Sequence, residues 1–462
     1  MMPRKFLTAA ALASLAVARP ALALPRGLAR QADALLASSY SADGPGASVV
    51  ITDHGKIAYE GTRGLADVAA KRPITSATVF RIASITKQFA AATVLQLAAE
   101  GKLKLSDPIS RYLPGYPNGD AINISQLLNH TSGIPDYTEI PGWMVEANLN
   151  RAYTTKQLTA VFQSLPAQSK PGEKWAYSSS GYILVGALIE AVTHKPWYQA
   201  VDERIFRPLR LSTMGYGVDE SRVATMATGY TNGEKSTAPS MKIDMSVAGA
   251  AGALIGTPRD LATWADALHH GRVLPGPYYA RMIAPTKLAD GSTAPYGFGL
   301  EIGQVRGHPT IGHSGGAPGF ATDSLYLPRD DVFVAVFSNT ENPPPSVETI
   351  TRRLAAMAVG SPYPTFTAVP FDVKKVAPML GVYKFKDAER IFAMRDGKLF
   401  TKRDGVETPV LSAGQNRFFY GPGELTWFSV RQDASGKYIF ERHANGEDEI
   451  DDGFRTEPVQ PR

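Results

Sequence analysis

Ser84 and Lys87 are the first residues of the chain whose types and spacing could do chemistry. Residues three apart on a helix share one face, so the two side chains can meet. At a helix N-terminus the serine oxygen lies near free backbone N–H groups and the positive end of the helix dipole. A lysine beside it stabilises the alkoxide or, when neutral, accepts the serine proton. This Ser-x-x-Lys pair occurs once in the chain, and the alternative is an N-cap serine followed by a solvated lysine.

Tyr177 begins a second candidate segment, Tyr177-Ser178-Ser179. It follows the turn residues Pro171-Gly172 and precedes a predicted helix, so it lies on a loop, where functional residues are common. A nearby lysine can lower the pKa of a phenol, which then serves as a general base. The alternative is a tyrosine that packs its ring and hydrogen-bonds its hydroxyl.

His313 lies in a third segment, His313-Ser314-Gly315-Gly316, between two apolar runs. The two glycines allow another part of the chain to approach the backbone closely. The backbone of such a segment can offer an N–H group to an oxyanion, and the histidine can supply a donor or a partial positive charge. The alternative is a glycine-rich turn with an incidental histidine.

The absence of cysteine limits the remaining chemistry. The 462 residues include no Cys, which excludes disulfides, thiolate metal sites and a cysteine nucleophile. A catalytic nucleophile must therefore be Ser, Thr, Lys or a carboxylate. Hydrophobic residues make up 44% and charged residues 20%, so the chain can bury a core, and its length favours more than one domain.

The N-terminus has the pattern of an export signal. Residues 1–5 are basic, residues 6–18 are apolar, and Ala21-Leu22-Ala23 is a small-x-small cleavage site. We expect a signal peptide over residues 1–23 and a periplasmic or secreted mature chain without a stable membrane anchor; the alternative is a buried N-terminal helix. Cleavage near Ala23 removes three basic residues and no acid, which lowers the formal charge from +5 to +2. Without a dense basic stripe interleaved with aromatic residues, a nucleic-acid partner is not expected.

Helical patterns and two β-hairpins alternate over the first 360 residues. Ala47–Asp53 and Lys56–Glu60 flank a turn and predict one hairpin, and Ser324–Tyr326 with Val332–Phe337 predict another. An apolar stripe predicts a helix over Thr86–Glu100, which begins within the Ser-x-x-Lys segment. Further helices are predicted over Arg26–Ser38, Ser125–Leu128, Tyr182–Thr193, Arg259–His269 and Glu348–Val359.

The composition changes after a plausible linker, Ser361-Pro362-Tyr363-Pro364. Short β-like runs then recur between turns, which predicts a small antiparallel barrel or sandwich of about a hundred residues. These runs are Gly381–Phe385, Arg390–Met394, Lys398–Thr401, Arg417–Tyr420, Leu425–Val430 and Tyr438–Arg442.

The three motifs, in the order Ser-x-x-Lys, Tyr-x-x and His-x-Gly, resemble those of the class C β-lactamase-like serine hydrolases. This family includes class C β-lactamases, D-alanyl-D-alanine carboxypeptidases, D-amino-acid peptidases and β-lactamase-fold esterases. The resemblance covers about Gly46 to Asn339. Further segments that match the family are Phe80–Lys87, Leu127–Gly133, Gly252–Leu261, Tyr296–Gly299 and Gly312–Phe320.

The resemblance implies an α+β fold with two domains. A β-lactamase/transpeptidase-like domain over residues 24–360 would contain an antiparallel sheet flanked by helices, together with an all-helical region. Residues 361–462 resemble the lipocalin-like β-barrels that follow this domain in some members of the family. The oligomeric state is not predicted.

The resemblance also implies a role for each motif. Ser84 would be the acylated nucleophile, and Lys87 would accept or relay its proton. Tyr177 would be the general base in acylation and in activating the deacylating water. The backbone N–H groups of Ser84 and Gly316 would form the oxyanion hole, and His313 would line the far wall and polarise the substrate. Further substrate contacts would come from Ser179, Ser314 and Gly315.

The implied reaction uses no metal or organic cofactor, and its substrate would be a small ester, amide or D-peptide. Two departures from the family pattern affect the substrate. Ser179 stands where many members have Asn, and a hydroxyl lacks the donor and acceptor pair of an amide. His313 stands where class C β-lactamases have Lys, and a mostly neutral imidazole binds a carboxylate more weakly. Both favour an esterase or peptidase, with at most weak β-lactamase activity.

Three other interpretations are possible from the sequence. Gly312 to Gly316 also fits G-x-S-x-G, the nucleophile elbow of α/β-hydrolases, in which Ser314 would be the nucleophile; that motif requires a following helix and later Asp and His residues. A metal hydrolase would need histidines on one helix face, but the eight His are scattered and His269-His270 are adjacent. The fold could also serve as a catalytically silent penicillin-binding-like module.

Overall fold

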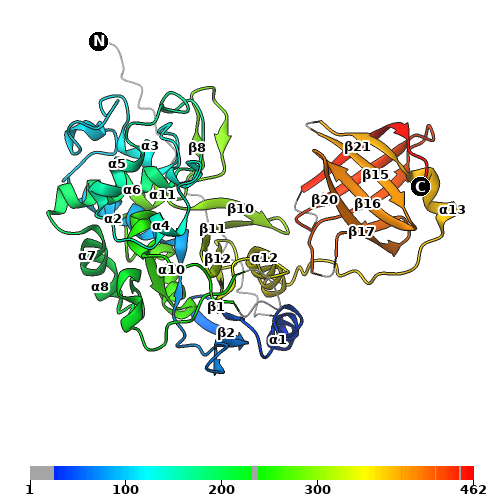
Figure 1. Ribbon diagram of the computed structural model, residues 1–462, viewed down its shortest axis with the longest axis horizontal. Helices are drawn as coiled ribbons and strands as arrows, with labels where there is room; N and C mark the ends of the chain where they lie inside the picture. The colour runs from blue at the N-terminus through cyan, green and yellow to red at the C-terminus, as the bar shows by residue number, and fades with distance from the viewer. Residues whose placement is uncertain (1–24, 232–237, 387, 422, 447–448, 462) are drawn as a thin grey trace, which may run out of the picture.

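A computed structural model describes residues 25–231, 238–386, 388–421, 423–446 and 449–461 of the chain. Figure 1 shows a larger part built of helices and a sheet, and a β-barrel beside it. The predicted α+β class, with a C-terminal antiparallel barrel, is confirmed. The signal peptide expected over residues 1–23 lies outside the described residues.

A six-stranded antiparallel sheet forms the centre of the larger part, in the order β10-β11-β12-β13-β1-β2. Both predicted hairpins are present as β1–β2 and β12–β13. β1 also pairs with β13, for example Val50 with Ala335, so the two ends of this part meet in one sheet. The strands are β1 (Ala47–Asp53), β2 (Lys56–Arg63), β10 (Glu301–Val305), β11 (His308–Ala317), β12 (Phe320–Leu327) and β13 (Val332–Ser338).

Helices cover both faces of this sheet. Successive side chains of a strand point to opposite faces, so a strand buried on both sides contributes to two cores. In β13, Val334 packs in the cluster that contains Leu354 of α12 (Val347–Ala358), and α1 (Leu28–Ser39) belongs to the same cluster. The next residue, Ala335, packs in the cluster that contains Trp264 of α10 (Pro258–His269).

The remaining elements of the larger part are mostly helical and form its other half (Figure 1). The α-helices are α2 (Thr86–Ala99), α3 (Ile124–Leu128), α4 (Glu146–Leu149), α5 (Thr155–Phe162), α6 (Ser179–Thr193), α7 (Trp197–Val201), α8 (Arg207–Leu209), α9 (Gly249–Gly252) and α11 (Gly276–Met282). The 3₁₀ and π segments are η1 (Ala83–Ile85), η2 (Ile109–Arg111), η3 (Tyr137–Glu139), η4 (Asp202–Phe206), η5 (Gly217–Arg222) and η6 (Met245–Val247). Short strands are β3 (Leu65–Asp67), β4 (Arg72–Pro73), β5 (Phe80–Arg81), β6 (Gly215–Tyr216), β7 (Leu254–Gly256), β8 (Thr286–Lys287) and β9 (Thr293–Ala294).

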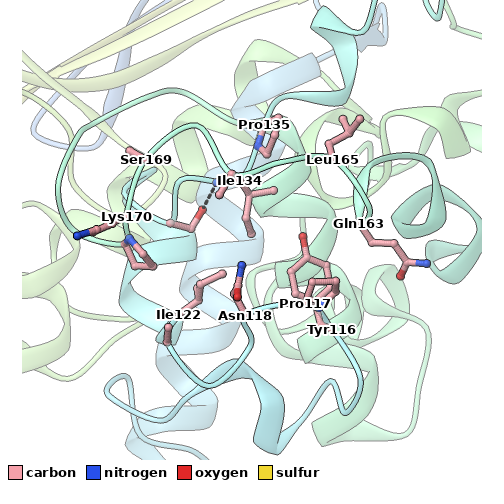
Figure 2. A pocket seen from close by; sticks show the side chains of 14 residues that line it. Tyr116, Pro117, Asn118, Ile122, Ile134, Pro135, Gln163, Leu165, Ser169 and Lys170 are labelled. Atoms are coloured by element: carbon pink, nitrogen blue, oxygen red, sulfur yellow. Dashed lines mark hydrogen bonds between the residues drawn. The ribbon is translucent and has the colours of Figure 1, made fainter.

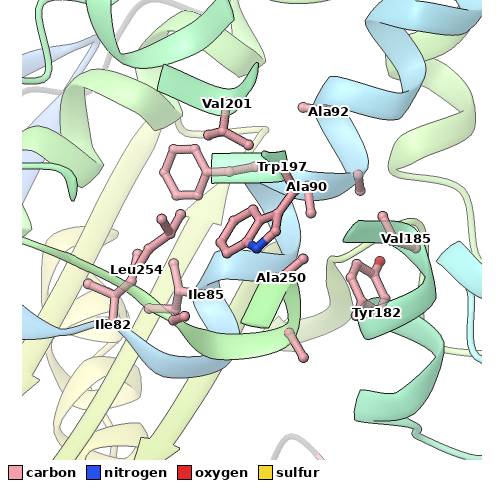
Figure 3. Close-up of a cluster of buried hydrophobic side chains, with 14 of the residues drawn as sticks. Ile82, Ile85, Ala90, Ala92, Tyr182, Val185, Trp197, Val201, Ala250 and Leu254 are labelled. Carbon is pink, nitrogen blue, oxygen red and sulfur yellow. The ribbon is translucent and has the colours of Figure 1, made fainter. Parts of the chain in front are cut away.

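Helix α2 is buried on nearly all sides, whereas its sequence pattern predicted only one buried face. Every residue from Thr86 to Leu95 is buried, including Lys87. Figure 3 shows Ala90 and Ala92 of this helix in a cluster with Trp197 of α7. Small alanine side chains let neighbouring helices approach the backbone of α2 closely. The helix that carries Lys87 is therefore held rigidly in the core.

The C-terminal part is a closed barrel of eight antiparallel strands. They are β14 (Gly381–Lys384), β15 (Glu389–Arg395), β16 (Lys398–Arg403), β17 (Val406–Gly414), β18 (Arg417–Phe419), β19 (Trp427–Gln432), β20 (Tyr438–Ala444) and β21 (Glu449–Pro458), preceded by α13 (Val373–Val376) and η7 (Ala377–Met379). The sequence predicted six of these strands and missed β17 and β21. Both missed strands are mostly exposed, so they lack an apolar pattern, and β21 forms by pairing with β14 and β20.

Aromatic rings fill the barrel interior. Phe428 lies 4.0 Å from Phe440 and 5.2 Å from Phe418, measured between ring centroids. Phe418 in turn lies 4.8 Å from Phe392. Small barrels of eight strands are just wide enough for side chains to fill. The barrel therefore has its own packed core, consistent with a separately folding unit.

Loops of the barrel contact the larger part through α12 and the β10–β11 turn. Leu425 packs among the residues of the α12 core, and the Arg353 guanidinium donates to the carbonyl of Gly423 at 3.0 and 3.1 Å. Arg306 donates to the carbonyl of Gly446 at 3.1 Å. The barrel is thus attached by defined hydrogen bonds. Of the helices among the described residues, none is long and apolar enough to cross a lipid bilayer.

Candidate active site

Ser84 lies on η1, the 3₁₀ turn that leads directly into α2. The residue before it, Ala83, has a φ angle of 46°, in the left-handed region that residues other than glycine avoid. The turn is held by Ile82, whose N–H donates to the carbonyl of Leu254 at 3.0 Å. Backbone strain of this kind is common at functional sites, where the surrounding structure must enforce it.

Lys87 lies one helical turn after Ser84, and its side chain is completely buried. Its Nζ atom lies 3.0 Å from Ser84 Oγ and donates to the carbonyl of Ala251 at 2.8 Å. Burial lowers the pKa of Lys87 to about 7, and the negative charges of Asp136 and Glu301 partly oppose that shift. A substantial fraction of Lys87 is therefore neutral near pH 7 and can accept the proton of Ser84.

Tyr177 lies against both of these residues. Lys87 Nζ is 4.8 Å from the centroid of the Tyr177 ring, and the tyrosine hydroxyl hydrogen-bonds with Ser84. The expectation that lysine lowers the pKa of this phenol is wrong, because burial raises the pKa of Tyr177. Its hydroxyl is thus protonated at neutral pH, which makes Lys87 the better proton acceptor and Tyr177 a proton donor or relay.

A cage of aromatic rings fixes the position of Tyr177. The His130 ring lies 4.4 Å from the Tyr177 ring and 4.7 Å from that of Tyr296. His130 Nδ1 accepts a hydrogen bond from the N–H of Ser178 at 3.1 Å. Burial lowers the pKa of His130 well below its usual value, so the imidazole is neutral and can accept this bond.

His313 faces the same site from β11. Its Nε2 atom lies 2.8 Å from the Tyr296 hydroxyl, and its ring lies 6.2 Å from the Tyr177 ring. Burial lowers the pKa of His313, while the nearby carboxylate of Glu301 opposes that shift. The four predicted catalytic side chains, Ser84, Lys87, Tyr177 and His313, are therefore brought together from η1, α2, the loop before α6, and β11.

The two glycines after Ser314 differ in their surroundings. A Cβ atom at Gly315 would lie 2.6 Å from the carbonyl oxygen of Ile82 and 2.6 Å from Thr322 Oγ1. The predicted close approach thus occurs at Gly315, where β11 packs against η1. At Gly316 a Cβ atom would meet nothing within 4 Å, so this glycine is not required by packing. Gly316 borders the same cavity as Ser84.

Gly315→Ala is expected to lower the free energy of unfolding by about 1–3 kcal/mol, because the added methyl group collides with backbone. Urea unfolding monitored by circular dichroism measures the change. Gly316→Ala is the matched control, with an expected change within about 0.5 kcal/mol. Equal midpoints for Gly315→Ala and the wild type would contradict this account of the β11–η1 contact.

Ser179 is the first residue of α6, and its neighbour Ser178 caps that helix through a 3.2 Å bond to the N–H of Gly181. The N–H of Ser179 donates to Asp136 Oδ2 at 2.8 Å. Asp136 was not predicted from the sequence. It is buried, and its other carboxylate oxygen caps η3 through the N–H of Thr138. Asp136 therefore anchors the loop before η3 to the start of α6, beside the candidate nucleophile.

A cavity of about 100 Å³ opens beside Ser84. Gly316 and Ala317 at the end of β11 and Pro318 of the turn that follows border it, and Ser179 borders it too. Its other lining side chains are largely apolar: Tyr137, Met144, Ile243, Met245 and Val247. Such a lining suits an uncharged acyl group.

A second cavity of about 400 Å³ lies on another side of the loop that carries Asp136. Figure 2 shows Asn118, Ile134 and Gln163 around it. None of the predicted catalytic residues lines this cavity. Cavity size therefore does not identify the reactive site in this fold.

The nucleophile-elbow interpretation of Ser314 is wrong. Ser314 lies within β11, which continues through a hairpin turn into β12, whereas the elbow requires a turn from a strand into a helix. Its hydroxyl donates to Glu301 Oε1 at 3.2 Å. Ser314 and Gly315 are nevertheless close to the site, as predicted.

The two adjacent histidines have separate partners. His269 Nδ1 lies 2.9 Å from the Tyr279 hydroxyl, and His270 Nε2 lies 3.2 Å from a carboxylate oxygen of Asp331. Within the described ranges of the chain, no three His, Asp or Glu side chains gather as a metal site would need.

Four residues near the site were given no role by the sequence analysis. His130 and Tyr296 fall in segments that match the family pattern, so a signal was present. Asp136 and Glu301 lie outside those segments, and no motif marks them. Their importance comes from contacts between elements that are distant in the sequence.

Comparison with known proteins agrees with this geometry. The Beta-lactamase family model matches residues 27–358. Penicillin-binding protein 4* of Bacillus subtilis is 26% identical over 404 residues, which cover 83% of this chain and 87% of that protein. The structure of D-amino acid amidase from Ochrobactrum anthropi SV3, complexed with L-phenylalanine amide, has a TM-score of 0.64 at 26% identity and covers 72% of this chain and 99% of that one.

A third similarity extends into the barrel. The octameric penicillin-binding protein homologue from Pyrococcus abyssi has a TM-score of 0.64 and covers 93% of this chain and 98% of that one. At 22% identity this likeness concerns the fold alone. The match of the family model across most of the chain, together with the Ser84, Lys87 and Tyr177 arrangement, shows that the chain belongs to the β-lactamase family of serine hydrolases.

Proposed function

We propose that this protein hydrolyses a small ester or amide through an acyl-enzyme on Ser84. The observation that carries the proposal is the buried Lys87, with a pKa lowered to about 7 and its Nζ atom 3.0 Å from Ser84 Oγ. A buried amine of low pKa beside a serine hydroxyl is a general base in position to act.

The reaction follows from these positions. Neutral Lys87 accepts the Ser84 proton as Oγ attacks the substrate carbonyl, and the oxyanion binds the backbone N–H groups of Ser84 and Gly316. The leaving group takes a proton from Lys87 through the Tyr177 hydroxyl as its bond to carbon breaks. Water then attacks the ester formed on Ser84 and gives its proton to Lys87, and Lys87 passes that proton to Ser84 Oγ as the bond to the acyl carbon breaks and the acid leaves.

The substrate class follows from the cavity and from the relatives. The apolar lining beside Ser84 suits the side chain of an amino-acid or short acyl group. The similar D-amino acid amidase supports an amide of an amino acid, and the family resemblance of the motifs adds a D-peptide or an ester. The neutral His313 and the Ser179 hydroxyl supply no strong site for a lactam carboxylate, so we expect weak β-lactamase activity at most. The N-terminal pattern supports a periplasmic or secreted enzyme after cleavage near Ala23.

Labelling with a fluorophosphonate probe, followed by peptide mapping, tests the proposal. We expect one labelled serine, Ser84, and turnover of p-nitrophenyl acetate and butyrate or a D-alanyl anilide well above that of a chromogenic cephalosporin. A label on another serine would overturn the assignment. Absence of both labelling and turnover would instead support a catalytically silent binding module.

A further inference from the structure

Glu301, the first residue of β10, places a carboxylate beside the reactive centre. Its Oε1 atom accepts a hydrogen bond from Ser314 Oγ at 3.2 Å and lies 3.6 Å from His313 Nδ1. The side chain remains 44% exposed, so a bound substrate can reach it. Its charge acts on Lys87 and on Tyr177, whose pKa values it raises.

Among the described residues, no lysine or arginine forms an ion pair with this carboxylate, and Lys87, whose charged form Glu301 favours, is partly neutral at pH 7. The carboxylate lies in ion-pair range of His313, whose pKa burial lowers, so the imidazole is largely neutral at pH 7. The Glu301 carboxylate is therefore the charged group at the His313 end of the site.

The geometry also separates the two halves of a substrate. The apolar cavity extends from Ser84 past Gly316 to Pro318 and can hold the acyl group. The leaving group must lie near the groups that protonate it, Lys87 and Tyr177. The Tyr177 ring is 6.2 Å from the His313 ring, and Ser314 beside His313 contacts Glu301. A leaving group next to Tyr177 therefore lies on the side of the site that His313, Ser314 and Glu301 form.

We infer that Glu301 determines the charge of the leaving group, favouring those with a positive charge and rejecting those with a carboxylate. The inference rests on the proposed function and adds a specificity-determining residue to it. A carboxylate beside Glu301 would suffer like-charge repulsion, and an ammonium would be attracted. A C-terminal amino acid with a free carboxylate would thus be a poor leaving group, whereas an amine or a cationic alcohol would be a good one.

Three butyrate esters that differ in charge test the inference: those of 4-hydroxybenzoate, 4-hydroxybenzamide and 4-hydroxyphenyltrimethylammonium. Each is compared between the wild type and Glu301→Gln, so differences in phenol reactivity cancel. Relative to the neutral ester, Glu301→Gln is expected to raise kcat/KM for the anionic ester about ten-fold and to lower it about ten-fold for the cationic ester. Glu301→Lys should shift both ratios further in the same directions. A uniform change across the three esters in both variants would overturn the inference.

Asp43→Asn is the matched control, since it removes the same charge from an exposed loop before β1, separated from β11 by β12 and β13. Asp43→Asn should change kcat/KM of the anionic or the cationic ester, each relative to the neutral ester, by less than about two-fold. A shift as large as that of Glu301→Gln would assign the effect to net charge and refute a local role. Ser84→Ala separates the two proposals, because turnover near the wild-type rate in that variant contradicts the acyl-enzyme whatever the ester ratios show.

Discussion

Ser84→Ala is expected to lower kcat/KM for p-nitrophenyl butyrate by about 10⁴-fold or more. The substitution removes the atom that would form the acyl-enzyme, and neither Lys87 nor Tyr177 can replace it. Little repacking should follow, because Ser84 is only partly buried and the change removes a single oxygen. Steady-state assays, with circular dichroism to check folding, measure the effect. Labelling by a fluorophosphonate should disappear in the same variant.

Ser314→Ala is the control for this loss, since it removes a hydroxyl from the same site. We expect it to retain much of the activity, because Ser314 lies within β11 and donates to Glu301. Complete loss in Ser314→Ala with activity retained in Ser84→Ala would reverse the assignment of the nucleophile.

Lys87→Met is expected to lower kcat/KM by about 10³-fold, the usual contribution of a general base. In the wild type the neutral amine is the active form, and burial sets the pKa of Lys87 at about 7. kcat/KM should therefore rise about ten-fold per pH unit below that value and reach a plateau above it. Lys102→Met provides the same substitution at a lysine that is exposed and paired with Glu100, and it should keep the wild-type profile. A profile that is flat between about pH 5 and pH 8 would exclude Lys87 as the base.

The same substitution should stabilise the fold. In the wild type the pKa of Lys87 falls from 10.5 in the unfolded chain to about 7 when folded, so the unfolded chain binds more protons between these values. The contribution of Lys87 to the free energy of unfolding therefore decreases as the pH falls from 10.5 to 7, and it is lowest below pH 7. Lys87→Met removes that penalty, so its gain in free energy of unfolding should be larger at about pH 6 than at about pH 9.5. A gain that does not vary with pH would contradict the buried, shifted lysine.

The motifs could be identified from the sequence because their chemistry depends on local spacing. Ser84 and Lys87 are three residues apart on one helix, and helical geometry alone brings them together. The hairpins β1–β2 and β12–β13 follow in the same way from alternating residues around short turns. Their pairing into one sheet, by contrast, joins residues nearly three hundred positions apart, such as Val50 and Ala335.

Strands β17 and β21 could not be predicted because they have little apolar pattern. Both are mostly exposed, and they become strands by pairing with neighbours that the barrel brings alongside them. The burial of α2 on nearly all sides has a similar origin, since alanine-rich helices do not reveal which of their faces are covered.

The sequence determined the kind of chemistry: the absence of cysteine excluded a thiolate nucleophile, and the three ordered motifs placed a serine, a lysine, a tyrosine and a histidine in one family pattern. Tertiary structure decided how those groups behave. Burial lowers the pKa of Lys87 and raises that of Tyr177, which favours Lys87, already expected to accept or relay the proton, over Tyr177 as the base. Asp136 reaches the site through a contact between distant segments, and Glu301 through the pairing of β10 with β11. Residue types and local spacing can be read directly from the sequence. Solvent exclusion and long-range electrostatics, by contrast, depend on which surfaces meet after folding.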